Sequence, residues 1–143
     1  METNKPERRL AAIMAADVVG YSSMMGKDEA GTLARLKDCE RILIQPAVTR
    51  HLGRIVKKMG DGYLVEFPSV VSAVECAIEW QEEINGPLRF RIGINLGDVI
   101  VEDDDLFGEG VNVAARLEAL ADPGGVAAER HAGVVEGRPR RQS

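Results

Sequence analysis

The chain has 143 residues, of which 45% are hydrophobic and 29% are charged, and its formal net charge is −5. This length fits one globular domain and is too short for two comfortable ones. The acidic balance argues against non-specific binding to nucleic acid or to an anionic membrane surface, but an anionic small ligand remains compatible when metal ions accompany it.

The apolar runs are short and interrupted, so no transmembrane helix is predicted, and the N-terminus leads into no signal-type apolar core. The cysteines, Cys39 and Cys76, lie in helix-like segments without metal or disulfide spacing. The two histidines, His51 and His131, are too scattered for a histidine-based metal site or a catalytic triad. We therefore expect a cytoplasmic protein with reduced thiols and no membrane partner.

The first half of the chain alternates strand-like and helix-like patterns. Residues 1–8 are polar and are expected to be flexible. The near-continuous apolar run over residues 9–19 predicts a buried central strand that ends at Gly20. Apolar residues at three- and four-residue steps predict a helix over residues 28–50, which Pro46 should kink or split near its end.

A hairpin and a second helix follow. Residues 54–59 and 63–67 are predicted strands, and Gly60-Asp61-Gly62 between them is a tight turn of the kind that joins antiparallel neighbours. Ser69 is a plausible N-cap for a helix that ends near Ile84.

The last patterned part of the chain repeats this alternation. Residues 88–95 alternate as a strand does, Gly97-Asp98 predicts a turn into a strand at 99–101, and a helix is predicted over 109–120. The order β-α-β-β-α-β-β-α predicts an α+β fold, an α/β sandwich in which helices cover a mostly antiparallel sheet of ferredoxin-like or palm type. Residues 128–143 carry no periodic apolar pattern and are expected to be disordered.

Two acidic residues lie where they could share a cation. Asp17 ends the buried strand, where a carboxylate is costly unless something pairs it, and Asp61 is at the hairpin tip. If the two strands are neighbours, both carboxylates reach the same one or two hard cations, such as Mg²⁺. Backbone N–H groups of Gly20-Tyr21-Ser22 could meet phosphate oxygens. The alternative is that Asp17 caps a helix and Asp61 only stabilises its turn.

Other polar residues have spacings compatible with a site. Lys57 and Lys58 are adjacent in a strand, so they point to opposite faces. Asn112 and Arg116 are four residues apart on one helix face, and Asp105 lies in the preceding loop. Together they could bind a base edge, a sugar and a transferring phosphate. The alternative is a solvated strand edge and the polar outer face of an amphipathic helix.

Four sequence segments contain most of these candidate residues. They are residues 15–22 (AADVVGYS), 57–62 (KKMGDG), 91–98 (RIGINLGD) and 105–118 (DLFGEGVNVAARLE). Together, in this order and spacing, they resemble the catalytic domain of class III adenylate and guanylate cyclases. The resemblance implies a nucleotide cyclase domain over residues 9–127 that lacks the last elements of the family fold, followed by a tail, residues 128–143, outside the family pattern.

The resemblance also implies a role for each residue. It places two Mg²⁺ or Mn²⁺ ions at Asp17, Val18 and Asp61, and the substrate on Gly20, Tyr21, Ser22, Lys57 and Asp105. In that scheme Lys57 and Asp105 read the adenine edge, Asn112 orients the ribose, and Arg116 stabilises charge on the α-phosphate in the transition state.

The implied reaction is the conversion of ATP into 3′,5′-cyclic AMP and pyrophosphate for intracellular signalling. Because the family divides its site between two domains, a homodimer that shares the site across its interface is expected, and a monomer is expected to be inactive. A catalytically weak or inactive module that dimerises or binds nucleotide is the alternative. A diguanylate cyclase or a phosphorylation receiver domain fits less well, because the signature hairpin of the first and the five-fold alternation of the second are absent.

Overall fold

The structure, a computed structural model, describes residues 6–84, 86–130 and 133–137. Its central strand is β1 (Glu7–Val18), which pairs along its length with β4 (Phe90–Glu102) and over its second half with β3 (Gly62–Phe67). Both pairings are antiparallel. Residues 11–16 of β1 are buried because side chains on both faces of this strand are covered.

Four further strands complete the described sheet. They are β2 (Arg54–Met59), β5 (Asp105–Phe107), β6 (Val126–Arg130) and β7 (Gly133–Gly137). The order is β2-β3-β1-β4-β6-β7, and β5 pairs with the outer part of β4. Among the described strands, β4 and β6 pair in parallel, and all other pairings are antiparallel.

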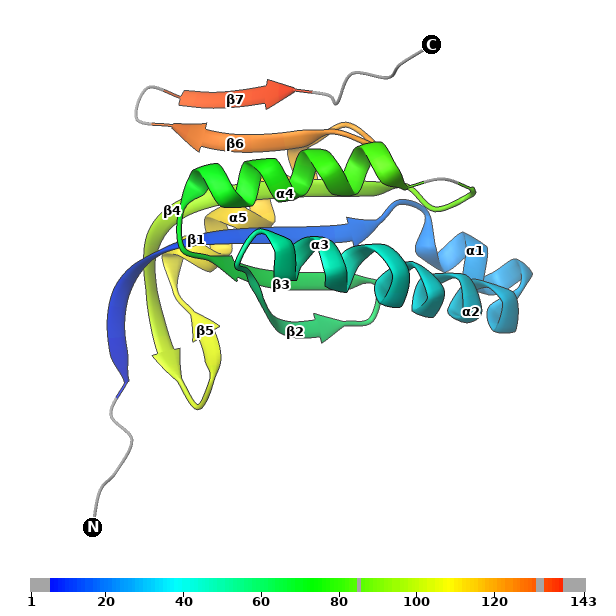
Figure 1. Cartoon of the computed structure of the whole chain (residues 1–143), viewed down its shortest axis with the longest axis horizontal. Coiled ribbons are helices and arrows are strands. Elements are labelled where there is room, and N and C mark those ends of the chain that lie inside the picture. Colours follow the sequence, from blue (N-terminus) through cyan, green and yellow to red (C-terminus); the bar gives the residue numbers. More distant parts are fainter. Residues whose placement is uncertain (1–5, 85, 131–132, 138–143) are drawn as a thin grey trace.

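The helices cover both faces of the sheet, in one layer on each side (Figure 1). They are α1 (Tyr21–Lys27), α2 (Glu29–Cys39), the π-helical turn η1 (Glu40–Ile44), α3 (Gln45–Arg50), α4 (Val70–Glu83) and α5 (Glu109–Leu120). One core lies under α2 to α4 and includes Met14, Trp80 and Phe90. The other lies under α5, where Ile13 and Val99 pack against Ala114. None of the described helices is long and apolar enough to span a membrane.

Glycines set the close approach of α5 to the sheet. A Cβ at Gly93 would lie 2.2 Å from the backbone nitrogen of Glu118 and 2.5 Å from the carbonyl oxygen of Ala114. A Cβ at Gly110 would lie 2.6 Å from the carbonyl oxygen of Asp98. These contacts leave no room for a side chain, so the backbone of α5 lies directly on β4.

The predicted architecture is confirmed. The sheet is mostly antiparallel, and helices cover both faces as in an α/β sandwich. The loop expected before the helix at 109–120 is wrong in part, because Asp105–Phe107 form a strand, β5, that pairs with β4. The strands at 54–59 and 63–67 and the helix at 109–120 agree with the structure to within one residue.

The turn predicted at Gly97-Asp98 is wrong, because β4 continues through these residues. Its ladder with β1 runs without interruption from Phe90, opposite Val18, to Val101, opposite Glu7, and this pairing overrides the local turn propensity. Gly97 instead serves packing, since a Cβ there would lie 3.1 Å from the Cα of Gly110.

The helix predicted over residues 28–50 is present but divided. The π-helical turn Glu40–Ile44 interrupts it just before Pro46, which occupies the first turn of α3. A separate short helix, α1, precedes it, and no separate helix was expected there.

At the termini, Glu7 and Arg8 belong to β1 although residues 1–8 were expected to be flexible. Residues 126–130 and 133–137 are strands, which differs from the expected disorder of 128–143. The other residues of both expected segments, apart from Pro6, lie outside the described residues.

Candidate active site

Asp17 and Asp61 are brought together at one end of the sheet. Asp17 is opposite Gly62 in the β1–β3 ladder, and the backbone N–H of Val18 donates to the carbonyl oxygen of Asp61 at 3.2 Å. Gly60 adopts the left-handed conformation (φ 59°) that the tight β2–β3 turn requires. The pairing of these strands, predicted only as a possibility from the sequence, therefore makes neighbours of two acids that are far apart in the chain.

A third carboxyl group, Glu118 of α5, contacts this acidic pair. Asp17 shares the α5-side face of β1 with Ile13 and Ala15, and its carboxylate is hydrogen-bonded to the side chain of Glu118. Burial and this hydrogen bond raise the pKa of Glu118 to about 8. Burial is also the main reason why the pKa of Asp17 is raised, and the negative charge of Asp61 adds to the effect.

The positive charge of Arg91 lies close to this cluster. Arg91 is directly opposite Asp17 in the β1–β4 ladder, and its Nε donates to the carbonyl oxygen of Ala121 at 3.0 Å. Its charge lowers the pKa of both Asp17 and Glu118, although burial outweighs it at both groups. The site thus concentrates negative charge in a half-buried position, with one cation from the protein nearby.

The chemistry of this donor set fits a hard divalent cation. Two carboxylates that raise each other's energy are stabilised when a cation lies between them, and Mg²⁺ commonly takes one or two protein carboxylates plus substrate phosphates. Across residues 6–84, 86–130 and 133–137, no three His, Cys, Asp or Glu side chains are arranged to hold a metal ion by themselves. Asp17 and Asp61 are the two carboxylates that the metal prediction relies on.

The predicted phosphate-binding segment follows β1 directly. Gly20 is left-handed (φ 69°) and precedes α1, in which Tyr21 packs against the core and Ser22 is exposed. The side chain of Val18 is buried in the same core, so only its backbone is available to a ligand. This segment is adjacent in the chain to Asp17, as the sequence predicts.

Lys57 and Asp105 form an ion pair although they are far apart in the sequence. The Nζ of Lys57 lies 3.0 Å from Oδ1 and 3.2 Å from Oδ2 of Asp105, and both side chains are partly exposed. The hydrogen bond from Lys57 holds the pKa of Asp105 below its ordinary value. Lys58 points to the other face and pairs with Glu40 at 2.7 Å, which confirms the predicted opposition of the two lysines.

A β-bulge selects the lysine that joins this pair. Ile55 pairs with Val65, but Lys57 pairs with Leu64, so β2 holds one extra residue, Val56, between them. Without the extra residue, Lys57 would be opposite Tyr63, on the face that α2 to α4 cover. With it, Lys57 shares the face of Leu64 in the core under α5.

Asn112 and Arg116 lie on the outer face of α5. Both are exposed, and the Nη2 of Arg116 pairs with Oε2 of Glu109 on the same helix at 3.0 Å. Glu118, two residues further on, faces Asp17. Two residues that are two positions apart on a helix point in nearly opposite directions. Arg116 therefore points away from the acidic pair of its own chain.

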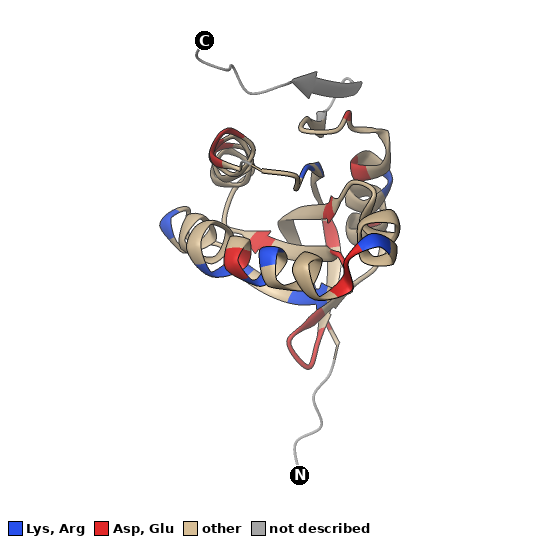
Figure 2. Ribbon diagram, turned by 90° about the vertical axis from the view of Figure 1, so that its right-hand side faces the viewer, with Lys and Arg blue, Asp and Glu red and all other residues tan. Residues whose placement is uncertain are grey.

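Acidic residues also gather at the tip of the β4–β5 hairpin, which projects below the sheet in Figure 2. Asp103 and Asp104 adopt left-handed conformations there (φ 52° and 65°). Of this group, Asp105 is the one that pairs with Lys57.

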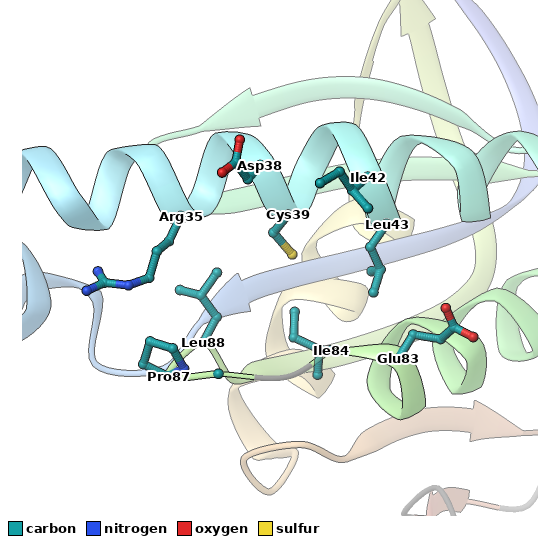
Figure 3. Close-up of a pocket in the computed structure, with 10 residues that line it drawn as sticks. Arg35, Asp38, Cys39, Ile42, Leu43, Glu83, Ile84, Pro87 and Leu88 are labelled. Carbon is teal, nitrogen blue, oxygen red and sulfur yellow. The ribbon is translucent and has the colours of Figure 1, made fainter.

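A pocket of about 380 Å³ lies elsewhere, on the face that α2 to α4 cover (Figure 3). Apolar side chains of Cys39, Leu43, Ile84 and Leu88 line it, and none of the predicted site residues does. Burial raises the pKa of the Cys39 thiol to about 11, so it is not a reactive thiolate at neutral pH. The pocket includes neither Asp17 and Asp61 nor the predicted phosphate-binding backbone after β1.

Residues 4–135 match the family described as the adenylate and guanylate cyclase catalytic domain. The chain belongs to this family. The matched segment ends at residue 135, whereas the sequence pattern suggested an end near 127.

Relatives of this cyclase domain carry names that agree with the family. It is 54% identical over 129 residues to "Putative adenylate cyclase 3" of Rhizobium meliloti (strain 1021), which covers 84% of this chain and 22% of that protein. It is 31% identical over 118 residues to an adenylate cyclase of Streptomyces coelicolor, covering 80% and 31% of the two chains. The cyclase domain thus spans between about a fifth and a third of the length of these curated relatives.

Solved structures share the fold. An adenylate/guanylate cyclase/hydrolase from Silicibacter pomeroyi superposes with a TM-score of 0.79 at 46% identity, covering 87% of this chain and 77% of the other. The adenylyl cyclase CyaB from P. aeruginosa has a TM-score of 0.74 at 24% identity, covering 88% and 79%. The second likeness bears on the fold alone.

The structure divides the predicted site residues into two groups. One comprises Asp17, Asp61 and the backbone after β1, together with the pair formed by Lys57 in the middle of β2 and Asp105 of β5. The other comprises Asn112 and Arg116, which the chain does not bring to the acids. Sequence reasoning missed Glu118. Its position four residues after the buried Ala114 places it on the inner face of α5, and that spacing is the signal that could have found it.

Proposed function

We propose that this cyclase domain converts ATP into 3′,5′-cyclic AMP and pyrophosphate. The observation that carries the choice of ATP is the ion pair between Lys57 and Asp105. Adenine presents a ring nitrogen that accepts a hydrogen bond next to an exocyclic amine that donates one. An ammonium and a carboxylate held side by side match that order, and guanine offers the opposite groups at these positions.

Asp17 and Asp61, with the backbone of Val18, would hold one or two Mg²⁺ or Mn²⁺ ions. When bound, such ions make the ribose 3′-hydroxyl a better nucleophile and neutralise charge on the phosphates. The 3′-oxygen then forms a bond to the α-phosphorus, the bond from that phosphorus to the bridging oxygen of the β-phosphate breaks, and pyrophosphate leaves with the electron pair. The hydroxyl proton passes to solvent. The N–H groups of Gly20, Tyr21 and Ser22 would bind phosphate oxygens.

Asn112 and Arg116 would complete the site from a second copy of the chain. Arg116 points away from the acids on its own sheet, and its guanidinium is solvent-exposed in the monomer. A homodimer in which each copy presents this face of α5 to the acids of the other would contain two equivalent sites. There Asn112 would orient the ribose, and Arg116 would stabilise the charge that develops on the α-phosphate.

The experiment is an assay of cyclic AMP and pyrophosphate with ATP and Mn²⁺ or Mg²⁺. We expect turnover of ATP in preference to GTP, no detectable turnover for Asp17→Ala, and loss of the ATP preference for Lys57→Met. Lys58→Met is the matched control, because it removes a neighbouring lysine that faces the other side, and it should behave as the unmodified protein does. Nucleotide binding without product would instead support a binding module, and a preference for GTP would overturn the roles given to Lys57 and Asp105.

A further inference from the structure

Phe107 is an exposed aromatic residue beside the proposed base site. It ends β5, where it is opposite Ile100 of β4, and its side chain is 44% exposed. Leu106, the residue before it, is buried under α5, so Phe107 and Asp105 share the other side of the short strand. Exposed apolar side chains are common on protein surfaces, so the contacts of Phe107, rather than its exposure, indicate a role.

The ring of Phe107 contacts the ammonium group of Lys57. The Nζ of Lys57 lies 5.4 Å from the ring centroid, within the range of a cation–π interaction, and 3.0 Å from Oδ1 of Asp105. Two groups on one short strand therefore hold the same ammonium. The backbone beneath both is fixed, because Asp105 pairs with Glu102 and Phe107 with Ile100 in the β4 ladder.

Lys57 needs such support for a physical reason. Its stem is flexible, and it leaves an edge strand next to a bulge, so its own backbone does not settle where the ammonium lies. The carboxylate of Asp105 attracts it but also has to accept a hydrogen bond from the base in the proposed complex. Once that happens, the Phe107 ring still holds the ammonium at the base edge.

We propose that Phe107 is a positioning residue that holds the Lys57 ammonium where it reads the adenine ring nitrogen, and so contributes to the choice of ATP over GTP. This inference rests on the proposed function and goes beyond it. Phe107 acts through Lys57 and need not touch the reacting atoms. Losing an exposed cation–π contact corresponds to about a two- to five-fold weaker interaction.

The test compares Phe107→Leu, which keeps apolar bulk but removes the π face, with Phe107→Tyr, which keeps the face. Binding of 3′-deoxy-ATP with Mn²⁺ is measured by calorimetry, since this analogue lacks the attacking hydroxyl and is not turned over. We expect Phe107→Leu to raise Kd about two- to five-fold, with the same change in KM for ATP and little change in kcat. Phe107→Tyr should restore binding.

A double-mutant cycle with Lys57→Met decides whether the effect passes through the lysine. In that background, Phe107→Leu should change nothing further. Val71→Ala, at an exposed apolar residue on α4, is the control and should leave Kd unchanged. Sedimentation of Phe107→Leu should show the same oligomeric state as the unmodified protein.

Several results would overturn the inference while leaving the proposed function intact. These are an unchanged Kd for Phe107→Leu, an equal effect in the Lys57→Met background, or a shift of Phe107→Leu to a lower oligomeric state. The proposed function fails separately, and the inference with it, if the unmodified protein neither binds 3′-deoxy-ATP nor forms cyclic AMP.

Discussion

Asp17 and Glu118 show how burial changes the behaviour of ordinary carboxyl groups. The two side chains share a hydrogen bond under α5, and one of them has to carry the proton because two negative charges so close together are unfavourable. The pKa of Glu118 rises to about 8, so the proton is held at neutral pH when no cation is bound. The folded protein therefore binds a proton that the unfolded chain releases near pH 4.5.

This difference predicts how stability depends on pH. A carboxyl group whose pKa is raised on folding stabilises the fold fully below its unfolded pKa, and the contribution is lost as pH rises through the folded pKa. Without divalent cations, the free energy of unfolding should fall by on the order of 1 kcal/mol from pH 5 to pH 8, because solvent reaches the partly exposed pair. Glu118→Gln should remove most of this slope, as measured by urea denaturation at each pH.

The matched control for that prediction is Glu109→Gln, which makes the same change of charge at an exposed position of the same helix. Its curve should keep the slope of the unmodified protein. Parallel curves for Glu118→Gln and the unmodified protein would show that the Asp17–Glu118 pair does not hold a proton.

Arg116 gives a second prediction at the level of the residue. Its ion pair with Glu109 is exposed, with 64% and 72% of the two side chains accessible, so it adds little to stability. Arg116→Ala should leave the melting temperature unchanged but lower kcat by about 10²–10³, as expected for a lost donor to transition-state charge. KM for ATP should change much less. Steady-state kinetics with Mn²⁺ measure both, and an unchanged kcat would remove Arg116 from the proposed reaction.

Among the elements, α5 lies on the sheet at a distance that only small residues permit. Gly93 lies beneath it, and a Cβ there would collide with backbone atoms of Ala114 and Glu118, which cannot move without moving the helix. Because α5 carries Asn112, Arg116 and Glu118, its displacement would disturb both parts of the proposed site.

Gly93→Ala should therefore destabilise the protein by about 1–3 kcal/mol and reduce cyclic AMP formation more than the loss of folded protein explains. Gly26→Ala in α1 is the matched control, because nothing lies within 4 Å of a Cβ there. It should be neutral or slightly stabilising, since alanine favours helix over glycine. Thermal denaturation and activity at a temperature where both variants are folded test this, and equal behaviour of the two variants would contradict it.

How far the elements could be predicted depends on where their signal lies. The helix at 109–120 and the hairpin at 54–67 have strong local patterns, and both were predicted to within one residue. Gly97 was misread, because its role is to admit Gly110 of a distant helix and no local pattern reports that contact. The bulge at Val56, which turns Lys57 toward Asp105, depends on the register with β3 and is also invisible in the sequence.

In the candidate site, too, local patterns could be predicted and contacts between distant residues could not. Asp17 and Asp61 could be suspected from an acid at a strand end and an acid at a turn, but their contact needed the order of the sheet. The pairing of Lys57 with Asp105 came from the family resemblance, since no spacing rule joins residues from an edge strand and a distant hairpin. Glu118 carries a helical signal, four residues after the buried Ala114, but its contact with Asp17 depends on how α5 packs on the sheet.

For the whole molecule, the arrangement of polar faces bears on assembly. Each chain directs Asp17 and Asp61 to one side of α5 and Arg116 to the other, so the groups that the proposed reaction needs do not meet within one copy. If each copy presents its Arg116 to the acids of the other copy, Asp17→Ala and Arg116→Ala damage different halves of each site. Asp17→Ala alone should then be inactive and Arg116→Ala alone nearly so, whereas their mixture should regain activity.

Equal amounts of the two variants, allowed to exchange subunits, should recover about a quarter of the activity of the unmodified protein. Half of the dimers are then mixed, and in each mixed dimer one site combines the intact acids of one copy with the intact arginine of the other, while the second site carries both defects. Energy transfer between differently labelled copies would confirm that exchange has occurred. If exchange is complete and no activity returns, the acids and Arg116 act within the same copy, and α5 would have to turn its outer face toward the sheet before the chain could react.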